Sequence, residues 1–222
     1  MADLLMTLAV LGGTGKEGKG LAYRWAKAGY PVIIGSRSAE KAQAAAAELA
    51  GKLDEGAAVE GMDNLSAAQK ADLVILTVPY AAHRETLETV KPALQGKILV
   101  DVTVPLVPPK VTRVHMPPAG SAAQEAHEIL GEGVEIVDAF QNISFELLMG
   151  GETVACDVLV TGTTKEARAD VLKLVEALGL TGWDAGPLEN SVVVEGLTSL
   201  LIYINRQYGS NHAGIRITGV NK

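Results

Sequence analysis

The sequence predicts an α/β protein with a doubly wound parallel sheet and a smaller C-terminal α/β part. Three observations predict it. Short apolar runs alternate with helical patterns along most of the chain, which is typical of parallel sheets covered by helices on both faces. A glycine-rich turn joins the first apolar run to the first helical pattern. The length of 222 residues is sufficient for a large core without disulfides.

Six apolar runs are predicted as strands, at residues 4–11, 31–35, 57–60, 72–78, 97–102 and 134–139. Helical spacing predicts helices between them, at residues 15–28, 38–50, 64–71, 81–94 and 121–130. Ser38 and Ser121 are the expected N-caps, while Gly51 and Gly131 end their helices. Five of the nine prolines fall in residues 104–120, which we therefore expect to form a long loop.

The alternation changes near Phe140. Residues 154–160 are predicted as a strand, and Thr163 with Glu166 as the capping box of a helix that ends at Leu178. A long helix is expected from residues 186–187 to about 208, and a terminal strand at 215–218. We therefore expect residues 1–140 to form one domain and residues 141–222 a smaller one that packs tightly against it.

Composition excludes several classes of function. The net charge of −7 repels phosphate backbones, and 4% aromatic residues offer few stacking surfaces, so no nucleic acid partner is expected. One cysteine excludes a disulfide framework and a cysteine-rich zinc site, and we expect no metal. The apolar stretch 192–204 is too short to cross a membrane, and residues 1–11 lack a basic leader, so a cytoplasmic protein is expected.

The turn after the first predicted strand has the pattern G-x-G-x-x-G. Gly13 allows the tight turn, Gly15 lets a pyrophosphate approach the backbone, and Gly18 lets the helix pack closely on the sheet. The N-terminus of that helix presents free N–H groups to an anion. The alternative is an ordinary glycine-rich turn, but the position between strand and helix favours a Rossmann dinucleotide-binding fold. The cofactor-binding residues expected here are Gly13, Thr14, Gly15, Lys16, Glu17 and Gly18.

The end of the second strand indicates which dinucleotide binds. An NAD site has an acidic residue there, whereas this chain has Ser36 and Arg37, with Lys41 one turn into the next helix. A hydroxyl and two cations suit a 2′-phosphate, so NADP(H) is favoured over NAD. The alternative is a solvated basic helix start, which the helix dipole disfavours.

Five segments together carry a family resemblance: LGGTGKEGKGLA, IIGSRSAEKA, ILTVPY, WDAGPLENS and EGLTSLLIYIN. In this order and spacing the chain resembles, over residues 8–217, the NADPH-dependent reductases of the deazaflavin coenzyme F420. The resemblance implies an N-terminal Rossmann domain, a small C-terminal domain, a homodimer, and hydride transfer between NADP(H) and coenzyme F420. The dinucleotide contacts that it implies fall on Thr14, Gly15, Lys16, Glu17, Ser36, Arg37 and Lys41.

The segment Val78-Pro79-Tyr80 follows the fourth predicted sheet strand, at the carboxyl edge where such sheets bind ligands. These three residues complete the expected dinucleotide site. Arg84 follows one helical turn later, and we expect it to face the pyrophosphate or the ribose.

The expected acceptor pocket follows the fifth and sixth strands of the sheet. The resembling family commonly has His-Thr-Ile-Pro-Ala after the sixth strand, where this chain has Gln141, Asn142, Ile143, Ser144 and Phe145. Gln and Asn can hydrogen-bond the edge of a pyrimidine-like ring, but unlike His they cannot titrate near neutral pH. This departure leaves two alternatives open: an NADPH-dependent reductase of an imine, a flavin or a ferric chelate, and a non-catalytic dinucleotide sensor. The pocket residues expected are Thr103, Val104, Pro105, Gln141, Asn142 and Ile143.

Hydride transfer between two bound ring systems asks for alignment and exclusion of water, so no catalytic side chain is expected. His83 is interpreted as a helix-surface residue, with contact to the nicotinamide as the alternative. Asp101 is expected to cap backbone N–H groups, and Cys156 to be a buried, inert thiol. Glu195 and Asn205 interrupt the apolar C-terminal helix, either on a solvated face or in contact with a ligand or a partner helix.

Overall fold

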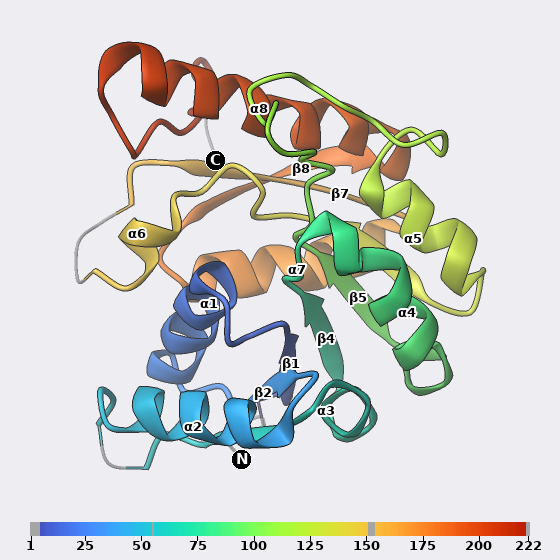
Figure 1. Ribbon diagram of the computed structural model, residues 1–222, viewed down its shortest axis with the longest axis vertical. Helices are drawn as coiled ribbons and strands as arrows, with labels where there is room; N and C mark the ends of the chain where they lie inside the picture. Colours follow the sequence, from blue (N-terminus) through green and yellow to red (C-terminus); the bar gives the residue numbers. More distant parts are fainter. Residues whose placement is uncertain (1–4, 55, 151–153, 221–222) are drawn as a thin grey trace.

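The computed structural model describes residues 5–54, 56–150 and 154–220, and within them eight strands form one sheet. The strand order is β3-β2-β1-β4-β5-β6-β7-β8. Figure 1 labels β1, β2, β4, β5, β7 and β8 of this sheet. All neighbouring strands are parallel except β6 and β7, which are antiparallel. The strands are β1 (Leu8–Leu11), β2 (Val32–Ser36), β3 (Val59–Asp63), β4 (Leu73–Leu76), β5 (Ile98–Asp101), β6 (Glu135–Asp138), β7 (Asp157–Gly162) and β8 (Thr181–Pro187). The predicted doubly wound α/β fold is confirmed.

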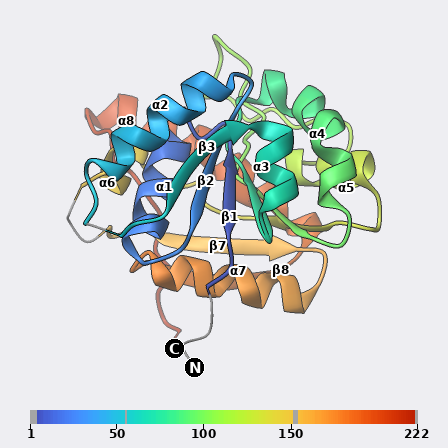
Figure 2. The ribbon, with the colours of Figure 1, turned by 90° about the horizontal axis from the view of Figure 1, so that it is seen from below.

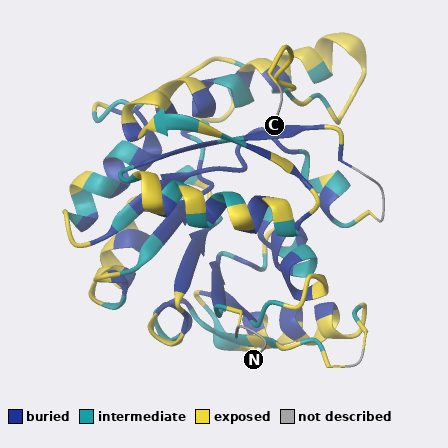
Figure 3. Cartoon of the chain, turned by 180° about the vertical axis from the view of Figure 1, so that it is seen from behind, coloured by how far each residue is buried: buried dark blue, intermediate teal, exposed yellow. Residues whose placement is uncertain are grey.

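Helices cover both faces of this sheet. Alternate side chains of each strand point to opposite faces, so Leu8 and Val10 pack on one side and Ala9 and Leu11 on the other. The first side carries α1 (Lys16–Lys27), α2 (Ala39–Ala50), α6 (Phe145–Leu148) and α7 (Lys165–Ala177); the second carries α3 (Asn64–Lys70), α4 (Tyr80–Leu94) and α5 (Ala122–Leu130). Figure 3 shows the result: the inner strands are buried, the edge strands β3 and β8 are partly exposed, and the outer faces of the helices are exposed.

The sheet twists strongly from one end to the other. In Figure 2, β7 runs across the direction of β1. Four neighbouring steps separate these strands in the sheet, and a twist of about 20–25° per step accounts for the change of direction. The last helix, α8 (Ser191–Tyr208), lies at the opposite end of the molecule from α2 (Figure 1).

In the C-terminal part, one strand was missed and one strand prediction was wrong. The structure has a strand at Thr181–Pro187 that the sequence pattern did not reveal, because glycines at 182 and 186 interrupt its apolar alternation. The predicted strand at 215–218 is irregular chain. It lies beside the start of β7, where Asp157 donates its N–H to the Ile215 carbonyl and accepts from Ile217 N–H through its carboxylate. Leu4, where the first predicted strand began, lies outside the described residues.

Several helix boundaries differ from those predicted. The last helix begins at Ser191 rather than at 186–187, after a short 3-10 turn at Leu188–Asn190. Thr164, not Thr163, caps α7, since its hydroxyl accepts from Ala167 N–H. Thr163 is instead held by β6, where it accepts from Ile136 N–H at 3.1 Å. The short α6 was not predicted.

The sheet runs continuously past residue 140. β7 pairs with β6 through Val137 and Asp138, so both strands of the C-terminal part extend the same sheet. At this point Phe140 has a φ of +75°, a left-handed conformation that is uncommon for a bulky residue. The division into domains at 140 stays a prediction.

Candidate functional site

The glycine turn places the N-terminus of α1 against the carboxyl end of β1. A Cβ added at Gly13 would lie 2.7 Å from a carbonyl oxygen of β1, and one at Gly18 would lie 2.5 Å from Thr77 Oγ1. Both positions therefore need glycine for close packing, and neither is on the cavity wall. Gly15 precedes α1 at Lys16, and no side chain caps the first turn. The first N–H groups of α1 remain available to an anionic ligand.

The end of β2 forms a cationic rim at the same edge. Ser36 is buried at the strand end, and Arg37 and Lys41 are exposed beside it. Ser38 caps α2 by accepting from Lys41 N–H at 3.3 Å, which fixes Lys41 in the first turn. Among the residues described, neither the Arg37 guanidinium nor the Lys41 ammonium has an acidic partner. Asn64, which sequence reasoning missed, joins this group with a buried, unpartnered side-chain oxygen.

The segment after β4 lines the cavity, but its polar side-chain groups bind α5 instead of facing the cavity. Val78, Pro79 and Tyr80 are on the cavity wall. The Tyr80 hydroxyl donates to Glu125 at 2.8 Å, and the Arg84 guanidinium binds the same carboxylate at 2.6 Å. Burial and the bond to Glu125 raise the pKa of Tyr80 to about 12. The Arg84 guanidinium thus binds a residue of α5, and Arg84 is not among the residues that line the cavity, so its contact with the pyrophosphate or the ribose stays a prediction.

After β5, Thr103 and Val104 line the cavity, whereas Pro105 is buried away from it. Asp101 accepts from Thr103 N–H at 3.0 Å, which confirms its capping role. Its other oxygen lies 2.7 Å from His83 Nε2. Interpreting His83 as a surface residue was wrong: its side chain is fully buried because it pairs with this carboxylate beneath the sheet edge.

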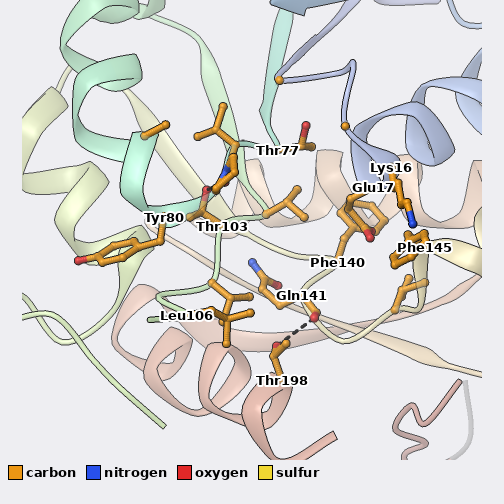
Figure 4. Close-up of a pocket in the computed structure, with 18 of the residues that line it drawn as sticks. Lys16, Glu17, Thr77, Tyr80, Thr103, Leu106, Phe140, Gln141, Phe145 and Thr198 are labelled. Atoms are coloured by element: carbon orange, nitrogen blue, oxygen red, sulfur yellow. Dashed lines mark hydrogen bonds between the residues drawn. The ribbon is translucent and has the colours of Figure 1, made fainter. Parts of the chain in front are cut away.

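After β6, Gln141, Asn142 and Ile143 reach the cavity, together with Phe140 and Phe145. In Figure 4, Gln141 lies between Thr103 on one side and Thr198 on the other. Lys16 Nζ lies 4.9 Å from the centre of the Phe145 ring, which brings the glycine turn and the α6 segment together.

The opposite wall comes from α8. Thr198 and Asn205 line the cavity from one face of this helix, and the Thr198 hydroxyl donates to the Gln141 carbonyl at 2.9 Å (Figure 4). The cavity volume is about 900 Å³, at the upper end for small-molecule sites. Sequence reasoning left Asn205 open and missed Thr198. Their spacing of seven residues along an apolar helix is the signal that points to a shared face.

Two acidic side chains lie around the site, Glu195 fully buried and Glu17 half-buried with one buried oxygen. Glu195 was interpreted as lying on a solvated face or in contact with a ligand or partner helix, but it is fully buried and accepts from Ala122 and Ala123 N–H at the start of α5. Burial raises its pKa to about 8. Glu17 lines the cavity beside Phe140, and burial raises its pKa to about 8 as well. Its Oε1 has no hydrogen-bond partner among the described residues.

These features define the class of protein. A parallel sheet with a glycine turn at the carboxyl end of β1, and with Ser36 and Arg37 at the end of β2, is a Rossmann dinucleotide-binding fold. In the described part of the chain, no helix has the length and apolarity needed to cross a membrane. No cluster of three or more potential metal-ligating His, Cys, Asp or Glu side chains occurs within those residues either.

Comparisons with known proteins identify the family. Residues 7–105 match the family described as "NADP oxidoreductase coenzyme F420-dependent". An F420-dependent NADP reductase from Methanocaldococcus jannaschii is 41% identical over 97% of this chain and 99% of its own length. Another, from Methanothermobacter thermautotrophicus, is 42% identical over 98% and 97%. The chain therefore belongs to the family of F420-dependent NADP reductases.

A solved structure agrees with this assignment. The protein from Arthrobacter sp. FB24, described as a candidate F420-dependent NADP reductase, superposes with a TM-score of 0.82 at 26% identity. The superposition covers 96% of this chain and 99% of that one. The likeness therefore includes β7, β8 and α8 as well as the dinucleotide-binding half.

Proposed function

We propose that this protein transfers a hydride between NADP(H) and coenzyme F420. One observation carries the proposal: the glycine turn with its cationic rim and the amide-lined wall of Gln141 and Asn142 open into the same cavity. A dinucleotide held at the first would place its nicotinamide toward the second. Relatives that are 41–42% identical over nearly the full chain are named for this activity.

The proposed roles of the residues follow from their places around the cavity. The N-terminus of α1, with Thr14 and Gly15, binds the pyrophosphate, and Ser36, Arg37 and Lys41 bind the 2′-phosphate. Val78 and Pro79 support the nicotinamide. Thr103, Val104 and the residues after β6 (Gln141, Asn142 and Ile143) hold the deazaflavin ring.

The chain supports hydride transfer by alignment. The two reacting carbons belong to the bound molecules and need to approach to about 3–3.5 Å. Apolar residues such as Leu106 and Phe140 on the cavity wall exclude water from that contact. No side chain is then required to exchange a proton with the reacting carbons, and we assign none a catalytic role.

The relatives favour deazaflavin over the alternative acceptors. Gln141, Asn142 and Ser144 depart from the expected His-Thr-Ile-Pro-Ala segment. This departure left two alternatives open: a reductase of an imine, a flavin or a ferric chelate, and a non-catalytic dinucleotide sensor. The full-length relatives carry the name of the deazaflavin-dependent activity. The amides at 141 and 142 are suited to hydrogen-bond the edge of such a ring.

The proposal is tested by mixing purified protein with NADPH and oxidised coenzyme F420 and following the loss of deazaflavin absorbance. NADH in place of NADPH, and FMN in place of F420, are the controls. We expect rapid bleaching only when NADPH and F420 are supplied together, and not in either control. Gln141→Ala should raise KM for F420 and leave the Kd of NADPH nearly unchanged; an equal loss of NADPH affinity would remove Gln141 from the acceptor pocket.

We also propose that the protein is a homodimer. α8 carries exposed apolar side chains on one side, with Val193 62%, Leu200 49% and Tyr203 56% exposed. A second copy would cover this face. Sedimentation equilibrium should give twice the 23.1 kDa chain mass, and Tyr203→Glu should shift it toward one chain. A monomeric wild-type protein would contradict the proposal.

A cytoplasmic location is proposed as well. Cys156, directly before β7, is buried and unpaired, and a free thiol is typical of a reducing compartment. Fractionation of cells that express the protein, with an antibody for detection, should recover it with the cytoplasmic fraction.

A further inference from the structure

Two neighbouring amides on the cavity wall are held by their nitrogen ends. Gln141 Nε2 donates to the main-chain carbonyl of Asp101 at 2.7 Å and to the Asp138 carboxyl group. Asn142 Nδ2 donates to the Val194 carbonyl at 3.1 Å. A main-chain carbonyl only accepts hydrogen bonds, so each NH₂ group has to face its carbonyl. The orientation of both amides is thereby fixed.

The oxygen ends of the same amides are unsatisfied. Gln141 and Asn142 are each only 6% exposed, and Gln141 Oε1 and Asn142 Oδ1 have no hydrogen-bond partner among the described residues. A buried acceptor without a donor is unfavourable, because it has given up its hydrogen bonds to water without replacing them. Because both residues line the cavity, a bound ligand that brings N–H groups would relieve this cost.

Asp138, at the end of β6, holds the Gln141 amide in this orientation. It is the last residue of β6, its side chain is fully buried, and its second oxygen faces the Thr161 hydroxyl on β7 at 3.5 Å. Thr161 in turn shares a hydrogen bond of 2.6 Å with the Ser191 hydroxyl at the start of α8. The carboxyl group therefore joins the Gln141 amide to a hydroxyl pair from two further elements.

The surroundings of Asp138 favour its neutral form. Burial, followed by the charges of Glu195 and Asp101, raises its pKa well above the usual range, and the hydroxyls of Ser191 and Thr161 oppose this only in part. A neutral carboxyl group has a carbonyl oxygen for the Gln141 NH₂ and an O–H for the hydroxyl pair. Asparagine has the same two functions in the same shape, whereas alanine has neither.

We propose that Asp138 is a positioning residue, which with the Asp101 carbonyl holds the Gln141 amide so that its oxygen is left for an N–H donor of the bound ligand. Asn142 supplies a second oxygen of the same kind. The ligand group is of the amide class: the ring imide N–H of the deazaflavin or the carboxamide NH₂ of the nicotinamide. The inference rests on the proposed function for the identity of these ligands.

The test measures equilibrium binding, because oxidised F420 and NADP⁺ do not react with each other. The Kd values of NADP⁺, of its 3-acetylpyridine analogue, which lacks the carboxamide NH₂, and of F420 in the presence of NADP⁺ are measured by fluorescence. The variants are Asp138→Ala, Asp138→Asn and, as a matched control, Asp157→Ala. Asp157 is a comparably buried carboxylate, and its partners Trp183 and Ile217 lie outside the cavity wall.

Asp138→Ala should weaken one ligand about tenfold, as expected for one hydrogen bond of about 1.4 kcal/mol. If F420 is weakened, the oxygen accepts from the ring imide. If NADP⁺ is weakened and the preference over the acetylpyridine analogue is lost, it accepts from the carboxamide. Asp138→Asn should bind both ligands within about threefold of wild type, and Asp157→Ala should bind normally while unfolding more easily.

Two results would overturn the proposal. Unchanged binding of all three ligands by Asp138→Ala would limit Asp138 to a role in folding, and equal weakening by Asp138→Asn would mean that its charge, not its shape, is needed. If the alanine variant does not fold, Asp138→Ser takes its place with the same expectation. A wild-type protein that binds NADP⁺ but not F420 would contradict the proposed function, while the acetylpyridine comparison would still test Asp138.

Discussion

The rings of Trp25 and Phe140 meet nearly at right angles, with centroids 5.6 Å apart and an interplanar angle of 88°. Trp25 is on α1, which follows the glycine turn, and Phe140 directly precedes Gln141. Both rings are buried, so this contact joins the two halves of the site. Phe140 has its left-handed φ where the chain leaves β6 and reaches the cavity, and Phe140 is itself part of the cavity wall.

Replacing Phe140 by alanine should therefore destabilise the whole protein. We expect Phe140→Ala to lower the free energy of unfolding by about 3 kcal/mol, since a large ring is lost from a packed core. Urea unfolding followed by circular dichroism measures this. Phe145→Ala is the control, because its ring is only half-buried, and should cost less than about 1 kcal/mol. Equal losses in both variants would argue against a special role for the Trp25 contact.

Arg37 should determine the preference for NADPH. Arg37→Ala removes a cation without an acidic partner in the described chain, and should raise the Kd of NADPH by about 10- to 100-fold, the effect of one charge-assisted contact. The Kd of NADH, which lacks the 2′-phosphate, should stay the same. Fluorescence titration measures both constants. Lys52→Ala, just beyond the C-terminal end of α2 and paired with Glu48, should change neither. A parallel loss of NADH affinity in Arg37→Ala would refute the assignment.

The His83–Asp101 pair should make stability depend on pH. Burial alone would lower the pKa of His83, but the charge and hydrogen bond of Asp101 outweigh it, so the pKa is raised. A raised folded-state pKa contributes stability that is full below the unfolded value of about 6.5 and is lost as pH rises through the folded value. Wild type should thus lose stability from about pH 6.5 upward.

Two variants separate the parts of this effect. His83→Ala leaves a buried carboxylate unpaired and should cost about 3–5 kcal/mol at pH 6. His83→Gln retains a hydrogen-bond donor without a titrating charge and should make the decline above about pH 6.5 shallower. Urea unfolding at several pH values measures both. A His83→Gln profile parallel to that of wild type would show that another group causes the decline.

Glu17 should destabilise the protein at alkaline pH. Burial raises its pKa to about 8, so the unfolded chain loses the proton near pH 4–5 while the folded chain retains it. Stability contributed by the protonated form therefore declines as pH rises from about 4.5 to 8 and is constant above. Glu17→Gln should melt like wild type at pH 4 and higher than wild type at pH 9, by roughly 2–4 °C for each kcal/mol relieved. Calorimetry at the two pH values measures these melting temperatures. If Glu17→Gln does not melt at a higher temperature than wild type at pH 9, then Glu17 is solvated when ionised.

Much of the fold follows from local pattern. The runs that became β1, β2, β4, β5 and β6 are short and apolar between helical segments, so their spacing was sufficient to predict the parallel sheet. β8 was not predicted because its glycines and Asp184 disrupt the alternation of apolar and polar residues. The pairing of β7 with β6 depends on contacts across the sheet that no local pattern encodes.

For the site as well, some residues could be predicted from the sequence and others could not. The glycine turn and the Ser36–Arg37 pair each lie directly at the end of a predicted strand, so their chemistry could be predicted from their positions in the sequence. Asn64 and Thr198 were missed because they reach the cavity from α3 and α8, and only the folded chain brings those elements to one edge. His83 and Asp101 are 18 residues apart, and their pairing required the register of α4 on β5.

The most direct test of the central claim follows the hydrogen itself. The protein is incubated with F420 and NADPH labelled with deuterium at the reacting carbon, on each face in turn, in ordinary water, and the reduced deazaflavin is analysed by mass spectrometry. Direct transfer predicts one deuterium in the product from one of the two labelled forms, because a carbon-bound hydrogen that moves as hydride does not exchange with water. Product without deuterium from either form, or no reduced deazaflavin, would contradict hydride transfer between the two molecules in this cavity.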